Sequence, residues 1–380
     1  MKPQRIRAFD WLRGLAVVFM IQTHAVVLLK PELRAHTFAR WLDRLDGLVA
    51  PAFLFSAGWS LAFVLCRAAA GGALDVAARA TARRIAGVFA VASLINTIWF
   101  PIWREPKWLL RLDILHCVAI SLALALPVVV AMARRPVILR WPALGMALLI
   151  FAVAPLVETT TGWLSVFTTT TPGALDPTTG SVFPLFPWAG YVFLGVSTGA
   201  TLAAGREENT SWRWLGLLAG LGATLWFFDD VLRAAYPPHH FWVTNPANAA
   251  QRWTLVLGLV SVLRLVELRG AGESRFARHL AAFGAASLSA YFIHEMLLFQ
   301  HSVGFFTRFW RNACDVPEWL ALLTALIALT WAGVQLWERA SAALTSAARQ
   351  RAWSSARHSS ARPSTESEQP PSRQTSPGTY

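Results

Sequence analysis

Apolar tracts of membrane-spanning length recur along this chain of 380 residues and constrain its fold more strongly than any other feature. The hydrocarbon core of a bilayer is about 30 Å thick and an α-helix rises about 1.5 Å per residue, so a span needs about 20 apolar residues. The sequence therefore predicts an all-α fold, a polytopic membrane bundle of about ten transmembrane helices. The predicted spans are 11–29, 48–66, 85–103, 112–131, 137–157, 183–203, 214–232, 253–268, 280–298 and 319–337.

The composition and the charge distribution agree with a membrane bundle. Hydrophobic residues make up 55% of the chain, charged residues 14%, and the mean hydropathy is +0.44, which is far from the composition of a soluble domain. A net charge of +13 would suggest nucleic acid in a soluble chain, but here the basic residues serve first as topology signals. If the N-terminus is cytoplasmic, Lys and Arg favour the cytoplasmic side by about two to one. We therefore expect both termini in the cytoplasm, lipid as a partner, and no nucleic-acid partner.

The chain is predicted to divide into a membrane domain and a tail. Residues 1–340 hold all the apolar tracts, whereas 341–380 are rich in Ser, Pro, Arg, Gln and Glu. Such a segment cannot bury a core, so we expect a disordered, basic cytoplasmic tail. The preference for Arg over Lys indicates a bacterial inner membrane. The apolar tracts predict that the chain crosses this membrane several times. The sequence leaves open whether the bundle forms a homo-oligomer.

The first apolar tract carries an arginine and a histidine and is directly preceded by an acid, and such groups are costly in lipid. At about 100° per residue, Arg13 and His24 fall within about 20° of each other on a helix, and Asp10 within about 40° of His24. The rise of about 1.5 Å per residue separates Arg13 from His24 by about 16 Å. This stripe indicates that one face of the helix is functional and that it extends over about half of the hydrocarbon thickness. The alternative is that Asp10 and Arg13 form an interfacial ion pair beside a packed histidine.

Further polar groups are predicted to gather on the outer side of the bundle. Three different helices bring His24, His116 and His294 to similar depth, with carboxylates nearby. A polar cavity with histidines suits proton abstraction from a hydroxyl or amine, because imidazole titrates near neutral pH. His116 and His294 are equally consistent with hydrogen-bonded packing residues. The candidate residues for an acceptor site are Asp113, His116, Trp188, Tyr191 and His294, and Asp46 lies just before the second span.

A metal site is the rival interpretation of three histidines. They come from separate helices, and no spacing constrains them to the geometry of zinc ligands. The three cysteines, Cys66, Cys117 and Cys314, also lack metal-ligand spacing. We therefore expect no metal.

Arginines crowd the loops that are predicted to face the cytoplasm. Most fit the positive-inside rule. Some can also hold the phosphates of a nucleotide-bearing donor, because guanidinium binds phosphate bidentately. The candidates for this role are Arg83, Arg84, Arg134 and Arg135.

Five motifs in one order along the chain resemble a known family. They are FDWLRGLA at 9–16 with Arg13 and His24 eleven residues apart, DGLVAPAFLFSAG at 46–58, LDILH at 112–116, FPLFPWAGYVFLG at 183–195 and SLSAYFIH at 287–294. Together they resemble the membrane-bound acyltransferase superfamily. In particular, they resemble the branch related to the heparan-alpha-glucosaminide N-acetyltransferase catalytic domain.

The resemblance implies an acyltransferase that takes an acetyl or other acyl group from cytoplasmic acyl-CoA and passes it to a sugar or glycan on the far side of the membrane. It implies His24 as the catalytic histidine, Arg13 as its paired basic residue, and Asp10 and Asp46 as supporting acids. Lysosomal members carry a histidine just before the Asp that opens the second span. Residues 42–46 here read Leu-Asp-Arg-Leu-Asp, so the role is expected to fall to His24.

Two other classes of protein also fit intramembrane polar groups. A transporter or flippase of a small polar or lipid-linked substrate places ionisable groups at mid-membrane, but usually shows repeated halves. A non-catalytic membrane scaffold would tolerate the loss of every buried polar residue. The ordered motifs favour the acyltransferase over both.

Overall fold

The computed structural model describes residues 6–99, 104–171, 180–205, 208–270, 274–299 and 304–360. Most of these residues are helical, and the described part of the chain holds two isolated β-bridges but no strand. The chain divides into two compact units, Met1–Val334 and Gln335–Tyr380.

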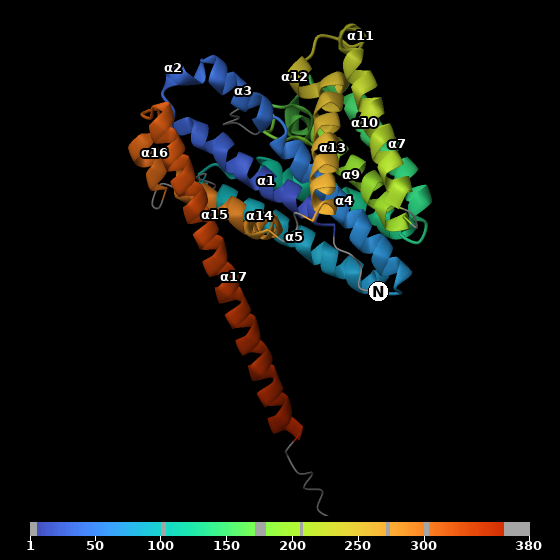
Figure 1. Ribbon diagram of the computed structural model, residues 1–380, viewed down its shortest axis with the longest axis vertical. Helices are drawn as coiled ribbons and strands as arrows, with labels where there is room; N and C mark the ends of the chain where they lie inside the picture. The colour runs from blue at the N-terminus through green and yellow to red at the C-terminus, as the bar shows by residue number, and fades with distance from the viewer. Residues whose placement is uncertain are drawn as a thin grey trace, which may run out of the picture. The chain divides into compact units, whose positions relative to one another are not determined.

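The elements are long helices, some of which are joined by short ones (Figure 1). The long helices are α1 (Arg7–Ala25), α4 (Val49–Ala70), α5 (Leu74–Trp99), α6 (Ile114–Met132), α7 (Pro136–Val157), α9 (Leu185–Ala204), α10 (Glu208–Phe227), α13 (Pro246–Leu268), α14 (Arg275–Ala285), α15 (Ser287–Phe299) and α17 (Val316–Ser360). The short ones are α2 (Pro31–Arg34), α3 (Thr37–Asp46), α8 (Ser165–Thr168), α11 (Asp229–Ala234), α12 (Phe241–Thr244) and α16 (Phe305–Trp310). Three 3₁₀ turns cover Val26–Leu28, Pro106–Leu110 and Gly162–Leu164.

Within the described residues, seven helical segments are long and apolar enough to cross a membrane, or eight if the bent pair α14 and α15 forms one span. The count of ten is therefore not confirmed. The helices α5 and α10 coincide with predicted spans but are not among these candidates. The first half of α5 carries Asp75, Arg79, Arg83 and Arg84, and such charges oppose insertion. The sides on which the termini lie stay a prediction.

Two predicted boundaries change in the structure. The tract 253–268 belongs to the longer helix α13, which begins at Pro246 because the Asn245 side chain accepts the Ala247 N–H at 2.8 Å. The helix α17 runs to Ser360 and thus enters the segment assigned to a tail. Residues 361–380 lie outside the described residues, and the disorder of the tail stays a prediction.

Helix α1 is anchored at both ends by other helices. The carboxylate of Glu267 on α13 accepts the N–H groups of Arg7 at 2.8 Å and Ala8 at 3.2 Å, which satisfies two donors that a helix start leaves open. The Trp11 indole donates to the Ala277 carbonyl at 3.0 Å, and the Trp319 indole donates to the Ala25 carbonyl at 3.0 Å. The stripe of α1 is therefore held in one orientation against α14 and the start of α17.

Glycines allow α14 to lie against α1. A Cβ on Gly14 would stand 2.1 Å from the Leu280 carbonyl oxygen, and one on Gly284 would stand 2.2 Å from the Asp10 carbonyl oxygen. The chain then bends by 81° between α14 and α15. Because α15 also contacts α1 (Figure 1), this bend brings the 287–294 motif beside the stripe of the first helix.

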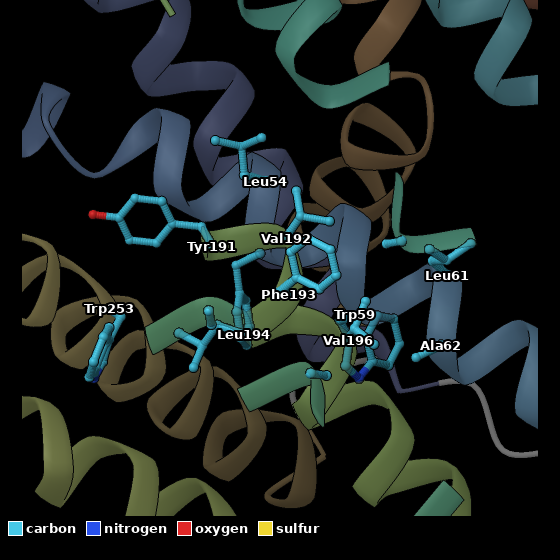
Figure 2. Close-up of a cluster of buried hydrophobic side chains, with 14 of the residues drawn as sticks. Leu54, Trp59, Leu61, Ala62, Tyr191, Val192, Phe193, Leu194, Val196 and Trp253 are labelled. Atoms are coloured by element: carbon cyan, nitrogen blue, oxygen red, sulfur yellow. The ribbon is translucent and has the colours of Figure 1, made fainter. Parts of the chain in front are cut away.

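A second glycine-mediated interface joins α4 to α9 and forms the packed core. A Cβ on Gly58 would stand 1.9 Å from the Val192 carbonyl oxygen, and one on Gly195 would stand 2.0 Å from that of Phe55. Small residues at such positions let helix backbones approach closely. Figure 2 shows the apolar side chains of both helices gathered here, with Trp253 of α13 at the edge of the cluster. One face of α4 is thus used for packing, which leaves the opposite face for a cavity.

Candidate active site

A cavity of about 380 Å³ lies between α1, α4, α5, α6 and α15. Most of its wall is apolar. Its polar lining residues are Arg13, Thr23, His24, Asp46, Ser56, Ser60, Arg84, Asp113, Ser287 and Tyr291. Helix α1 therefore turns its predicted stripe, from Arg13 to His24, toward the cavity.

Basic groups line one part of the cavity. The Arg13 guanidinium donates through Nε to the Ser56 hydroxyl at 3.3 Å and through Nη2 to the Ser56 carbonyl at 3.4 Å, and Nη2 also contacts the Ser60 hydroxyl. Arg84 of α5 lines the same cavity. Two serines one turn apart on α4 thus hold the guanidinium of Arg13 against the cavity wall.

A cluster of two histidines and a glutamate forms where His24, eleven residues after Arg13 on α1, meets His294 and Glu295 of α15. The His24 Nδ1 atom is 2.8 Å from His294 Nε2 and 2.9 Å from Glu295 Oε1. Behind it, His294 is fully buried, and its Nδ1 atom is 2.9 Å from the Ala290 carbonyl oxygen. We call His24, His294 and Glu295 the His–Glu cluster. Only His24 of the three lines the cavity.

Two carboxylates from other helices complete this part of the wall. The Tyr291 hydroxyl donates to Asp113 Oδ2 at 2.9 Å, while Asp113 Oδ1 accepts the Ile114 N–H at 2.7 Å and caps α6. Asp46 contributes a buried Oδ1 atom that has no hydrogen-bond partner among the described residues. The cavity wall thus carries two arginines, a histidine, two carboxylates and a phenol.

Several predicted site residues do not line this cavity. Asp10 is buried on α1, and His116 is buried where it caps α6, with its Nδ1 atom 3.4 Å from the Asp113 N–H. Trp188 and Tyr191 belong to the apolar core around α9, where the Tyr191 ring lies 5.0 Å from that of Phe151. The structure therefore does not bring these four residues together with His24 at the cavity wall.

The predicted phosphate-binding arginines also separate. Arg84 lines the cavity, whereas its neighbour Arg83 does not. Arg134 and Arg135 lie in the turn between α6 and α7 and are not among the residues that line the cavity. Their predicted role in donor binding stays a prediction.

The His–Glu cluster also has the composition of a metal site. Its three potential ligand atoms lie within 4.8 Å of one another, and imidazole and carboxylate are ligands that zinc accepts. The same short distances are also those of three side chains held together by hydrogen bonds without a metal. The absence of a metal stays a prediction that metal analysis of the purified protein will test.

Sequence reasoning missed Glu295, Ser56 and Ser60. Glu295 directly follows His294 within an apolar tract, and an acid there is a signal in its own right because charges in spans are costly. The two serines gave no signal, because hydroxyls are common in transmembrane helices and their contact with Arg13 arises only from the packing of α4 against α1.

The family comparison decides the class of this site. The model of the heparan-alpha-glucosaminide N-acetyltransferase catalytic family matches residues 5–228, more than half of the chain. The chain belongs to this family. The match confirms the family resemblance, includes the first four of the five motifs but not the one at 287–294, and supports a membrane transferase. None of the curated proteins compared with the chain matches it.

The matched residues of this N-acetyltransferase-family chain supply Arg13, His24, Asp46, Arg84 and Asp113 to the cavity. Helix α15, with Tyr291, His294 and Glu295, lies beyond the matched range. The site therefore combines the family domain with a later helix.

Proposed function

We propose that this protein is an integral membrane acyltransferase that moves an acetyl or other acyl group from cytoplasmic acyl-CoA to an extracytoplasmic sugar or glycan. The observation that carries the proposal is the single cavity that joins Arg13 and Arg84 to His24. Membership of an N-acetyltransferase family supports the reaction class. The mainly apolar wall between these groups suits the pantetheine arm and acyl chain of the donor.

In this proposal the donor enters from the cytoplasm. The phosphates of acyl-CoA lie on cytoplasmic arginines, with Arg84 at the cavity and Arg83, Arg134 and Arg135 further out. Charge-assisted bonds from guanidinium to phosphate supply the affinity. Arg13, held by Ser56 and Ser60, places a positive charge along the path of the thioester, and Asp10 supports α1 behind it.

The acceptor occupies the part of the cavity with carboxylates. Asp46 and the Asp113–Tyr291 pair bind its hydroxyl groups, and His24 removes the proton of the attacking hydroxyl or amine. The acceptor oxygen or nitrogen then bonds to the thioester carbonyl carbon, the C–S bond breaks, and the proton passes from His24 to the leaving thiolate. General-base catalysis of this kind typically contributes about 10²–10⁴-fold. We place the enzyme in a bacterial inner membrane, with lipid around it.

The test is label transfer from radiolabelled acetyl-CoA in inside-out membrane vesicles. We expect label to enter a membrane or lumenal glycan with the wild type, and His24→Ala to lower the rate about 10³-fold or more while leaving donor binding intact. His240→Ala, which changes an exposed histidine outside the cavity, is the matched control and is expected to retain transfer. Full transfer by His24→Ala would refute the role of His24, and no transfer by the wild type from either acetyl-CoA or a longer-chain acyl-CoA would refute the acyltransferase.

A further inference from the structure

The His–Glu cluster contains more than the base itself, and its hydrogen bonds determine where the protons lie. A backbone carbonyl can only accept, so the 2.9 Å contact between His294 Nδ1 and the Ala290 oxygen places a proton on Nδ1 of His294. In a neutral imidazole the other nitrogen is then an acceptor. His294 therefore presents an unprotonated Nε2 atom to His24.

Two acceptors consequently face the same nitrogen of His24. Its Nδ1 atom is 2.8 Å from His294 Nε2 and 2.9 Å from Glu295 Oε1. An ionised carboxylate is likewise an acceptor only. The proton shared among these atoms must therefore belong to His24 Nδ1, which leaves Nε2 as the basic nitrogen of the neutral ring.

The basic nitrogen is on the edge of the ring that the His–Glu cluster leaves free. The His24 side chain is 30% exposed and lines the cavity. No described residue forms a hydrogen bond with Nε2, whereas the opposite edge of the ring meets fully buried His294 and nearly buried Glu295. The His24 ring is thus held at its buried edge by His294 and Glu295, which is the arrangement of an oriented general base.

We propose that Glu295 is the positioning residue of this site: together with His294, it holds His24 in the Nδ1–H tautomer and balances the imidazolium that forms during transfer. This inference rests on the proposed function. When Nε2 takes the acceptor's proton, the ring becomes cationic while its Nδ1–H stays bonded to the Glu295 carboxylate. When the thiolate leaves, it receives that proton from Nε2 and the ring is neutral again.

The first test is the substitution Glu295→Gln. A glutamine amide can donate to Nδ1, which moves the ring proton to Nε2 and removes the base. We expect kcat to fall about 10²–10⁴-fold, as for the loss of an orienting acid beside a catalytic histidine, while KM for acetyl-CoA stays within about twofold. Glu295→Asp keeps the charge and is expected to restore part of kcat. Glu158→Gln, which changes a comparable His–Glu pair outside the cavity, is the matched control and is expected to leave kcat per folded molecule unchanged.

The second test needs no acyl transfer. In the wild type labelled with ¹⁵N-histidine, the two ring nitrogens of His24, assigned by difference from His24→Gln, should show a protonated Nδ1 and an unprotonated Nε2. A protonated Nε2, a kcat for Glu295→Gln within about threefold of the wild type, or a stoichiometric metal ion bound by the His–Glu cluster would each overturn the proposal. If the wild type shows the Nδ1–H tautomer but transfers no label, the proposed function fails while the hydrogen-bond geometry stands.

Discussion

Two His–Glu pairs of the same chemistry occur in this molecule and have different surroundings. In the first, His24 bonds to Glu295 at 2.9 Å, and the histidine side chain is 30% exposed, toward the cavity. In the second, His240 bonds through Nδ1 to Glu158 at the end of α7, and the histidine side chain is 80% exposed. Glu158 also accepts the Thr244 hydroxyl at 2.6 Å and the His240 N–H at 3.0 Å.

The difference shows that residue types alone do not define a site. Glu158 joins the end of α7 to the start of α12, and its oxygens are engaged by the groups that it holds together. The Glu295 carboxylate instead serves a histidine whose other nitrogen faces a cavity with arginines and carboxylates. The second pair is a structural clamp, and the first has the arrangement of a base and its orienting acid.

The largest expected difference between the two His–Glu pairs is in how much each glutamate contributes to the stability of the fold. Glu158→Gln replaces an acceptor of charge-assisted bonds by an amide whose NH₂ group opposes the donors of Thr244 or His240. We expect the free energy of unfolding to fall by about 2 kcal/mol, as measured by chemical unfolding in detergent, with transfer per folded molecule unchanged. A loss of transfer without a loss of stability would contradict the assignment of this pair as a clamp.

The same contrast applies to two neighbouring arginines. Arg84 lines the cavity and Arg83 does not, although both precede the apolar part of α5. Arg84→Ala is expected to raise KM for acyl-CoA about fivefold, or about 1 kcal/mol, whereas Arg83→Ala, which removes a proposed phosphate contact outside the cavity, should raise KM less, by about twofold. Initial rates in inside-out vesicles measure both. Equal increases would mean that local positive charge matters rather than the position at the cavity.

The smallest effect concerns pH. Burial works to raise the pKa of Glu158, but hydrogen bonds from Thr244 and His240 outweigh it and hold the pKa below its ordinary value. A carboxyl of this kind stabilises the fold above its unfolded pKa of about 4.3 and loses that contribution as the pH falls through its folded pKa. The stability difference between the wild type and Glu158→Gln should therefore be present at pH 7 and shrink below about pH 4. A stability difference that grew as the pH fell would contradict the lowered pKa of Glu158.

Much of the site was predictable because it is local to one helix. Arg13 and His24 share a stripe through the helical period alone, and the structure places both at the cavity. The candidates on other helices were less well predicted. Depth in the membrane placed His116, Trp188 and Tyr191 near His24, but depth says nothing about which face of a helix meets which neighbour. In the structure these three side chains are used for capping and packing.

The sequence by itself determined that the chain is a helical membrane bundle, that its first helix carries a polar stripe, and that it belongs with the N-acetyltransferase family. These properties depend on hydrophobicity, helical period and motifs, all of which are local along the chain. Only the tertiary structure decided that Glu295 and His294 meet His24 across about 270 residues, that Ser56 and Ser60 hold Arg13, and that Arg84 but not Arg83 lines the cavity. The contact of Glu295 and His294 with His24 depends on the glycine-mediated approach of α14 to α1 and on the bend before α15. The other two depend on how α4 and α5 pack in the bundle, and no local pattern specifies any of them.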